Sequence, residues 1–314
     1  MSTKLIRSLS AITPREQGGV LTIGNFDGVH LGHQQLLNRV LQFASEKSLP
    51  SLALTFEPHP ALYFRGRSQA FPRLTGIREK FQLISDQCIN NLLLINFNQH
   101  LASLSASDFV IKILACQLQP AVIVIGEDFR FGHLRMGDVA LLQHLGGRLG
   151  FVVSVVPPFK QDGLRVSSTL IRQVLVEGDL QAATRLLGHP YFICGRVACG
   201  DQIGRQLGFP TANIYLDHRT VPIQGVFAVR VNGIAGESLS GVASLGTRPT
   251  VHGTRKVLEV YLFDFNQAIY GRMICVQFCE KLRDEVYFEN LDLLKEQIIK
   301  DVAIARAYHA KRST

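Results

Sequence analysis

The sequence predicts an α/β protein in two parts, a doubly wound parallel sheet followed by a small antiparallel β-barrel with a C-terminal helix. Continuous apolar runs alternate with amphipathic segments over the first 187 residues. After Leu187, β-prone runs separated by glycine-rich turns replace this alternation. An amphipathic pattern closes the chain. We therefore expect one domain over residues 1–187 and a second over residues 188–314.

The expected strands of the first domain are five apolar runs, which is typical of strands covered on both faces. They are Val20–Gly24, Ser51–Phe56, Leu92–Phe97, Ala121–Gly126 and Phe151–Val156. Helical spacing occurs in the segments between them, at Gly32 to about Glu46, Ile77–Gln87, Ser107–Gln117 and Gly137–Leu145. In such a Rossmann-like sheet the ligand site lies beyond the C-terminal ends of the strands.

The second domain begins where Gly188 and Pro190 interrupt the helical pattern of Asp179–Leu187. Its β-prone runs are Gly225–Val231, Val257–Phe263 and Arg272–Phe278, and a helix is expected over Leu291–Ala307. This order predicts an antiparallel barrel capped by one helix.

Composition restricts the classes of partner. With 46% hydrophobic and 18% charged residues among 314, the chain is expected to fold into packed domains. The formal charge of +8 comes from scattered Lys and Arg residues, which argues against a nucleic-acid binder and fits anionic small substrates. The first residues contain no apolar signal region, and no apolar run is long enough to span a membrane. We expect a cytoplasmic enzyme without a membrane partner.

The six cysteines show neither a C-x-x-C pair nor the spacing of a zinc site. Cys275 and Cys279 would share a strand face, whereas Cys194 and Cys199 would point to opposite faces, so a four-thiolate site is awkward. We expect buried free thiols.

The segment Gly24–His33, GNFDGVHLGH, places a turn between the first expected strand and the first expected helix. A helix start offers unpaired N–H groups and a positive dipole end to phosphates. His30 and His33 lie on one face of the first turn and can donate hydrogen bonds to a triphosphate. We expect a triphosphate site formed by Gly24, Asn25 and Phe26, with His30 and His33 as catalytic residues that stabilise the charge building on the α-phosphoryl group.

This HxGH pattern is similar to that of a nucleotidyltransferase superfamily. Together with GEDFRFGHLRMGD at Gly126–Asp138 and RVSSTLIR at Arg165–Arg172, it resembles the FMN adenylyltransferase domain of prokaryotic bifunctional riboflavin kinase/FAD synthetases. The resemblance implies that the SSTxIR segment opens a helix and holds the ATP phosphates. The matching positions are Arg165, Ser168, Thr169 and Arg172.

Further positions follow from the same resemblance. TFEPHP at Thr55–Pro60 resembles a segment near flavin and ATP, which makes His59 a flavin-binding candidate and leaves Glu57 as an ordinary loop residue or a site residue. Asp128 stands where relatives often carry Asn, and is a second flavin-binding candidate. Asp27 is either a turn former or a direct participant, and Phe129 and Phe131 belong either to the core or to a ring-stacking site.

The glycine-rich segment Gly195–Ile214 is not a Walker loop, because the chain contains no GxxxxGK[ST]. Gly200, Gly204 and Gly208 allow a loop to bend over a nucleotide. Thr211 and Asn213 offer the oxygen ligands that Mg²⁺ prefers.

PTAN, Pro210–Asn213, resembles the signature of riboflavin kinases, which implies that Thr211 and Asn213 sit beside magnesium and the terminal ATP phosphates. Glu259 matches the base that takes the proton from the ribityl hydroxyl, and Arg283 matches a residue near the flavin ring, although it could equally be an ion-pair partner. Tyr261 stands where many relatives place His. This difference removes no expected catalytic group, and we expect it to affect the affinity for nucleotide or flavin.

The expected function is a Mg²⁺-dependent transferase that binds riboflavin, FMN, FAD and ATP, with a kinase site in the second domain and an adenylyl-transfer site in the first. One alternative is a nucleotidyltransferase for another phosphate acceptor with an accessory flavin-binding barrel. Another is a non-catalytic flavin-binding regulator. The sequence does not define the oligomeric state.

Overall fold

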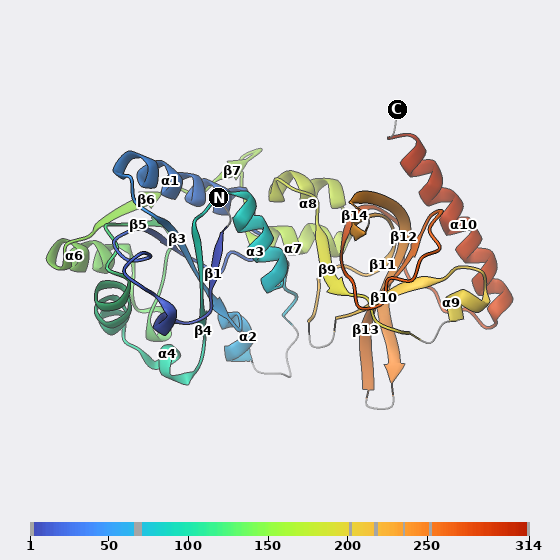
Figure 1. Cartoon of the computed structure of the whole chain (residues 1–314), viewed down its shortest axis with the longest axis horizontal. Coiled ribbons are helices and arrows are strands. Elements are labelled where there is room, and N and C mark those ends of the chain that lie inside the picture. The colour runs from blue at the N-terminus through green and yellow to red at the C-terminus, as the bar shows by residue number, and fades with distance from the viewer. Residues whose placement is uncertain are drawn as a thin grey trace. The chain divides into compact units, whose positions relative to one another are not determined.

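The computed structural model describes residues 3–65, 71–200, 203–216, 219–234, 236–250 and 253–312 (Figure 1). The chain forms two compact units. The first contains residues up to Phe71 and Lys80–Ser168, and the second contains Pro72–Glu79 and the chain from Thr169 onward. A short segment within the first part of the sequence thus belongs to the second unit. Gln202, in the glycine-rich loop, lies outside the described residues.

The sheet of the first unit has six strands in the order β1-β4-β3-β2-β5-β6, and every neighbouring pair is parallel. The strands are β1 (Lys4–Ile6), β2 (Val20–Ile23), β3 (Ser51–Glu57), β4 (Asn91–Asn96), β5 (Val122–Gly126) and β6 (Val152–Val156). Strand order reverses between β2 and β5, which is the position where doubly wound sheets bind ligands. The predicted fold class of this part is confirmed.

Most predicted helices are present near their expected limits. From the N-terminus to Leu187 the helical segments are η1 (Leu9–Ala11), α1 (Leu31–Lys47), α2 (Pro60–Arg65), α3 (Ile77–Asp86), α4 (Gln99–Ser103), α5 (Ala106–Asp108), η2 (Phe109–Leu118), η3 (His133–Arg135), α6 (Val139–Leu149), α7 (Ser168–Glu177) and α8 (Leu180–Leu187). Gly188 ends α8 in the left-handed conformation, as its position predicts. A two-stranded ribbon, β7 (Lys160–Gln161) with β8 (Leu164–Arg165), precedes α7.

One predicted helix differs in kind. The segment expected at Ser107–Gln117 is the short α5 followed by η2, a π-helix. Its buried side chains, Phe109, Val110, Ile113, Leu114 and Leu118, pack into the core that covers the parallel sheet. A π-helix widens each turn, and apolar spacing alone does not separate it from an α-helix.

The second unit is a nearly closed antiparallel barrel with strand order β10-β13-β12-β11-β14-β9. Its elements are β9 (Phe192–Arg196), α9 (Ile203–Gln206), β10 (Thr211–Tyr215), β11 (Gly225–Ile234), β12 (Glu237–Thr250), β13 (Gly253–Leu262), β14 (Met273–Arg283) and α10 (Leu291–Ala310). An isolated bridge between Ala198 and Asn213 links the two edge strands. The predicted barrel and C-terminal helix are confirmed.

Side chains of the barrel strands alternate between its interior and its outer surface. Ala212, Ile214, Leu258 and Val260 are buried, whereas Thr211 and Glu259 are only partly buried. Because residues directly opposite in a ladder share a face, the register of β10 and β13 decides which polar groups lie together.

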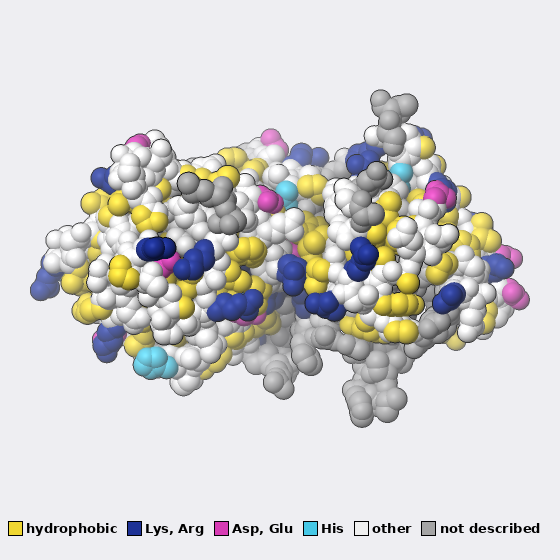
Figure 2. Space-filling model, in the orientation of Figure 1, with side chains coloured by type: hydrophobic (Ala, Val, Ile, Leu, Met, Phe, Trp, Pro, Cys, Tyr) yellow, Lys and Arg dark blue, Asp and Glu magenta, His cyan; other side chains and the backbone are white. Residues whose placement is uncertain are grey.

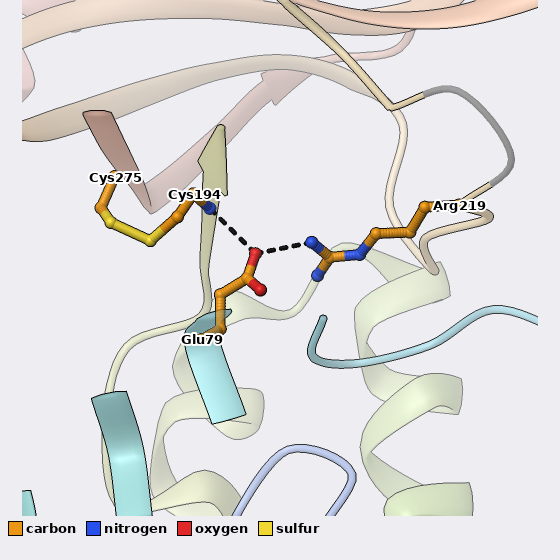
Figure 3. Close-up of a disulfide and its surroundings, with 4 residues drawn as sticks. All are labelled: Glu79, Cys194, Arg219 and Cys275. Atoms are coloured by element: carbon orange, nitrogen blue, oxygen red, sulfur yellow. Dashed lines mark hydrogen bonds and ion pairs between the residues drawn. A yellow bond between two sulfur atoms is a disulfide. The ribbon is translucent and has the colours of Figure 1, made fainter. Parts of the chain in front are cut away.

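The prediction of six buried free thiols is wrong. Cys194 of β9 lies opposite Cys275 of β14, and the two form a disulfide (Figure 3). Cys88, Cys116 and Cys199 are exposed and Cys279 is half-buried. The pairing depends on strand register across 81 residues of sequence, which local patterns do not contain.

On the face shown in Figure 2, Lys and Arg side chains are dispersed among uncharged ones. Among the residues that the structure describes, no helix is long and apolar enough to cross a membrane.

Candidate active sites

The first unit contains a cavity of about 780 Å³ at the carboxyl ends of the parallel strands. The loops after β2, β3, β5 and β6 all contribute to its wall, so the cavity lies beyond the C-terminal strand ends, as predicted, at the switch point between β2 and β5. The structure brings together here eight residues that the sequence selected. They are Gly24, Asn25, Phe26, His30, His33, His59, Asp128 and Arg165.

The two histidines of the motif are held in a fixed arrangement at the start of α1. The Nδ1 atom of His30 accepts a hydrogen bond from the backbone N–H of His33 at 3.3 Å, so His30 is the N-cap of the helix. The two imidazoles stack with their centroids 3.7 Å apart. The buried ring of Phe26 packs edge-on against His33, 5.2 Å between centroids. Both imidazoles therefore line the cavity from one helical turn.

The protonation of His33 follows from its surroundings. Burial, the neighbouring His30 and the ammonium group of Lys80 together hold the pKa of His33 well below its usual value. His33 is therefore neutral at physiological pH, and a neutral imidazole still offers one N–H donor.

The RVSSTLIR segment meets the motif loop at one point. The hydroxyl of Ser168 donates to the backbone carbonyl of Asp27 at 2.8 Å, which ties the start of α7 to the loop. Arg165 forms an exposed ion pair with Asp128. Thr169 is exposed, and the Nε–H of Arg172 donates to the carbonyl of Pro72 at 2.7 Å. Ser168, Thr169 and Arg172 are not among the residues that line the cavity.

An aromatic wall on this cavity was predicted only in part: Phe129 and Phe131 were ring-stacking candidates, whereas Phe56, Phe64 and Phe97 were missed. Phe97 contacts both Phe56 and Phe64, at 5.8 and 5.6 Å between ring centroids. Phe129 stacks on Phe131 at 5.3 Å, and all five rings line the cavity. They come from four separate segments, so no local motif could have grouped them. A wall of this kind suits a planar aromatic ligand.

His59 closes one side of the same cavity. Its Nδ1 atom accepts the backbone N–H of Ala61 at 3.1 Å, and its ring lies 4.9 Å from the ring of Phe71.

The barrel unit contains a smaller cavity of about 250 Å³, lined in part by Gly200, Arg205, Thr211 and Asn213. A Cβ atom added to Gly200 would collide with the amide group of Asn213, so the glycine permits the loop to approach β10 closely. Gly204 and Gly208 do not line the cavity. A Cβ on Gly204 would meet the carbonyl of Phe209, and Gly208 has a φ of +92°, so both shape the turn that leads into β10.

Three predicted kinase residues share the outer face of the barrel beside this cavity. Asn213 lies directly opposite Glu259, and Thr211 lies opposite Tyr261 two residues along the same ladder. On the other side of β13, Glu259 lies opposite Ser244. The register therefore places a carboxylate next to the two expected magnesium ligands.

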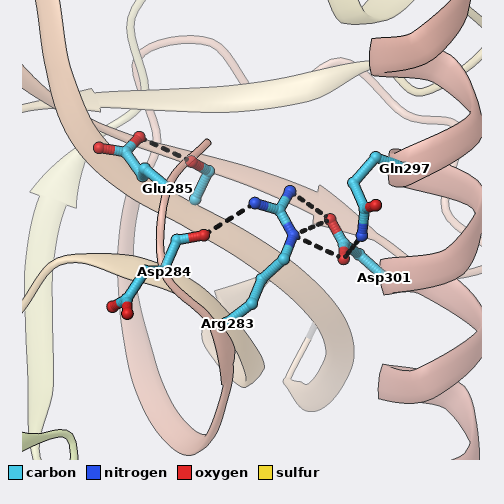
Figure 4. Close-up of polar contacts among 6 residues, drawn as sticks. Arg283, Asp284, Glu285, Gln297 and Asp301 are labelled. Carbon is cyan, nitrogen blue, oxygen red and sulfur yellow. Dashed lines mark hydrogen bonds and ion pairs between the residues drawn. The ribbon is translucent and has the colours of Figure 1, made fainter. Parts of the chain in front are cut away.

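A further carboxylate near this face was missed. The hydroxyl of Ser244 donates to Glu285 at 3.4 Å (Figure 4), and a Cβ atom on Gly246 would occupy the position of the Glu285 carboxylate. Glu285 follows β14, far from Ser244 in sequence, and the two come together because β12 and β14 both pair with β11.

Arg283 forms an ion pair with Asp301 of α10 (Figure 4). Its Nε–H donates to both carboxylate oxygens of Asp301 at 2.9 and 3.1 Å, and its Nη2 donates to the same group at 2.7 Å. Asp301 is 4% exposed. This pair fixes α10 to the end of β14, and it is the ion-pair alternative that the sequence left open.

In the described parts of both units, no group of three or more His, Cys, Asp or Glu side chains is placed to hold a metal ion. The oxygen donors Thr211 and Asn213 belong to a different ligand class.

A doubly wound sheet with paired histidines at its switch point, followed by an antiparallel barrel with a PTAN strand, defines a two-domain nucleotide-dependent transferase. Residues 12–170 match the family model described as FAD synthetase, and residues 187–309 match the one described as riboflavin kinase. The chain belongs to the bifunctional riboflavin kinase/FMN adenylyltransferase family.

Curated relatives share both parts. The bifunctional riboflavin kinase/FMN adenylyltransferase of Haemophilus influenzae is 45% identical, over 97% of this chain and 99% of its own length. The protein of the same name from Escherichia coli K12 is 43% identical, over 97% of each chain. A crystal structure of a protein named macrolide-efflux protein, from Streptococcus pneumoniae, covers 98% of this chain and 99% of its own, with a TM-score of 0.79 and 30% identity.

Proposed function

We propose that the barrel unit phosphorylates riboflavin to FMN with ATP and that the sheet unit then adenylylates FMN to FAD. The observation that carries this proposal is that the motif Gly24–His33 lines a cavity within the first unit, whereas Thr211 and Asn213 of PTAN line another within the second. We propose the division of the two activities at 1–187 and 188–314, with residues 72–79 as a part of the first stretch that packs in the second unit.

For adenylyl transfer, a phosphate oxygen of FMN attacks the α-phosphorus of ATP, and pyrophosphate leaves. We assign His30 and His33 as donors to the phosphates, together with the loop Gly24, Asn25 and Phe26 at the N-terminus of α1. Charge builds on the phosphoryl oxygens during transfer, and N–H groups fixed before the reaction stabilise it without reorganisation. The aromatic wall with His59 and Asp128 is assigned to the flavin ring.

The remaining residues of this site act as follows in the proposal. Arg165, Ser168, Thr169 and Arg172 supply guanidinium and hydroxyl donors for the triphosphate. Ser168 supports the assignment most directly, because its hydroxyl already contacts the motif loop. Arg165 would leave Asp128 to bind a phosphate. Because their ion pair is exposed, breaking it costs little free energy.

For the kinase reaction, the terminal ribityl hydroxyl of riboflavin attacks the γ-phosphorus of ATP, and ADP leaves. Glu259 accepts the proton of that hydroxyl. Gly200, Gly204 and Gly208 shape the loop that covers the nucleotide. Arg283 is assigned to the flavin ring by the resemblance; its Nη1 donates to the carbonyl of Asp284 at 2.9 Å, and the rest of its guanidinium pairs with Asp301.

The residues at β10 fit a magnesium ion. Thr211 and Asn213 are oxygen donors on one strand face beside Glu259, and the missing Cβ at Gly200 leaves room against Asn213. We assign Thr211 and Asn213 to hold Mg²⁺, which supplies charge neutralisation for the ATP phosphates when bound. We propose that the enzyme acts in the cytoplasm.

The test is to incubate the purified chain with riboflavin and Mg-ATP and to separate the flavins by chromatography over time. We expect FMN first and FAD second. Absence of both products at saturating substrate would overturn the proposal. FMN without FAD, even when FMN is supplied, would favour a sheet unit that acts on another phosphate acceptor.

A further inference from the structure

Lys80 is a fully buried cation in the sheet unit, on α3, and its side chain is 1% exposed. An ammonium group out of water costs several kcal/mol unless nearby groups compensate for its lost hydration. The helical pattern around it is amphipathic, and a lysine there would be expected at the surface. Its burial therefore needs an explanation in what surrounds it.

One contact of the Lys80 ammonium leads to the phosphate loop through the hydroxyl of Thr55. Its Nζ donates to Oγ1 of Thr55 at 3.2 Å, and Thr55 Oγ1 donates to the backbone carbonyl of Asn25 at 3.2 Å. An ammonium group has no acceptor, so Lys80 fixes the direction of this chain. The one hydroxyl proton of Thr55 is thereby committed to Asn25.

Asn25 is at the centre of the proposed phosphate site. It follows Gly24 at the end of β2, lines the cavity, and precedes Phe26, whose ring packs on His33. The loop backbone is anchored on its other side by the N–H of Gly24, which donates to the carbonyl of Leu54 at 3.0 Å. The carbonyl of Asn25 is thus held by β3 and α3 from beneath.

The positive charge of Lys80 affects the protonation of His33. It contributes to the lowered pKa of His33, after burial and His30. A positive charge behind the loop disfavours a second proton on the imidazole and attracts the oxygens of a triphosphate in front of it.

We infer that Lys80 is a positioning residue for nucleotidyl transfer, which acts through Thr55 to set the phosphate loop at Asn25 and adds a buried positive charge behind the ATP phosphates. This inference rests on the proposed function for the identity of the phosphate ligand. Lys80 is not among the residues that line the cavity, so it does not touch substrate in this role.

The test compares Lys80→Met, Thr55→Val and Thr55→Ser with a surface control, Lys112→Met, in the full chain. Met keeps the length and burial of Lys80 and removes its charge. Lys112 is 61% exposed and its loss changes the net charge equally. kcat and KM for ATP and for FMN are measured in FAD formation from supplied FMN, and FMN formation from riboflavin by the same preparations reports folding.

We expect Lys80→Met to lower kcat/KM for ATP in FAD formation about 10- to 100-fold. KM for FMN and the kinase activity should stay within about twofold. Thr55→Val should lower kcat/KM for ATP less than Lys80→Met does, and Thr55→Ser should lower it less than Thr55→Val. The double variant Lys80→Met/Thr55→Val should lose no more than Lys80→Met alone, because both residues act along one path.

Two results would overturn the inference. One is an unchanged kcat/KM for ATP in Lys80→Met. The other is an equal loss of both activities with a lowered melting temperature, which is what a purely structural lysine would give. If the unmodified chain forms no FAD, the proposed function fails, and calorimetric binding of Mg-ATP without flavin decides the inference separately: one of the two ATP sites should bind about tenfold more weakly in Lys80→Met, and equal binding at both sites would refute it.

Discussion

The two candidate sites are built differently although both use ATP. The first is a cavity of about 780 Å³ at strand ends and a helix start, and its assigned phosphate ligands are imidazoles, hydroxyls, guanidinium groups and backbone groups. The second occupies the outer face of barrel strands, where a carboxylate lies opposite an amide in the ladder. The nucleophiles explain the difference. The phosphate of FMN is already ionised at neutral pH, whereas a ribityl hydroxyl carries a proton that must be removed.

The largest expected difference between the two sites comes from the substitution Glu259→Gln. The variant keeps the shape of the side chain and removes the base, so FMN formation should fall roughly 10²- to 10⁴-fold. FAD formation from supplied FMN should be unchanged, as measured by chromatography of both reactions. Loss of both activities in a protein with an unaltered melting curve would contradict the separation of the sites.

The reciprocal variant is His30→Ala, for which FAD formation should fall roughly 10²- to 10³-fold and FMN formation should remain. Removal of the N-cap also weakens the start of α1 by about 1 kcal/mol. His30→Asn is the matched control, because Asn caps a helix but lacks the imidazole. Recovery of FAD formation in His30→Asn would assign the effect to capping rather than to phosphate binding.

Gly200→Ala tests the close approach between the loop and β10. The added methyl group must displace the side chain of Asn213, so kinase turnover should fall about 10- to 100-fold with FAD formation unaffected. Gly147→Ala in α6 is the control, since nothing lies within 4 Å of a Cβ at that position. Steady-state kinetics with varied Mg²⁺ would show the loss; a variant with unchanged kinetics would remove Asn213 from the site.

The smallest effect concerns the stability of the sheet unit alone. Lys4 and Thr13 lower the pKa of Glu16 from 4.5 to about 2 by hydrogen bonds at 2.7 to 2.8 Å. A lowered carboxyl pKa stabilises the folded state above pH 4.5, and this contribution is lost as the pH falls toward 2. Glu16→Gln should cost about 1 to 3 kcal/mol at pH 7 in urea unfolding and progressively less below pH 4.5. An equal cost at all pH values would show that charge is not involved.

The fold was predictable where the sequence carries long regular patterns. The five long apolar strands of the parallel sheet, the strands β11, β13 and β14, and α10 all lie near their expected limits. The strands β1, β9 and β10 were not predicted, because they are three to five residues long and, in β10, alternate with polar residues that face outward. β12 begins in a polar, glycine-containing segment that resembles a turn.

The site was predictable only where its residues are contiguous in sequence. GNFDGVHLGH and PTAN each define a loop or strand whose members must lie together. Lys80, Glu285 and the disulfide between Cys194 and Cys275 depend on contacts between segments 25 to 81 residues apart, and these follow from packing and register. Arg283 is the opposite case: its sequence position matches the motif, but in the structure its guanidinium pairs with Asp301.

The buried carboxylate of Glu79 limits how this chain can be divided (Figure 3). Glu79 is 1% exposed, accepts the backbone N–H of Cys194 at 2.9 Å and pairs with Arg219, and all three residues belong to the barrel unit. A gene fragment that starts at residue 188 would encode every barrel strand and still lack this carboxylate. The two activities are thus not encoded by two separable consecutive segments. The N-terminal part of the sequence contributes a buried carboxylate to the structure of the barrel unit.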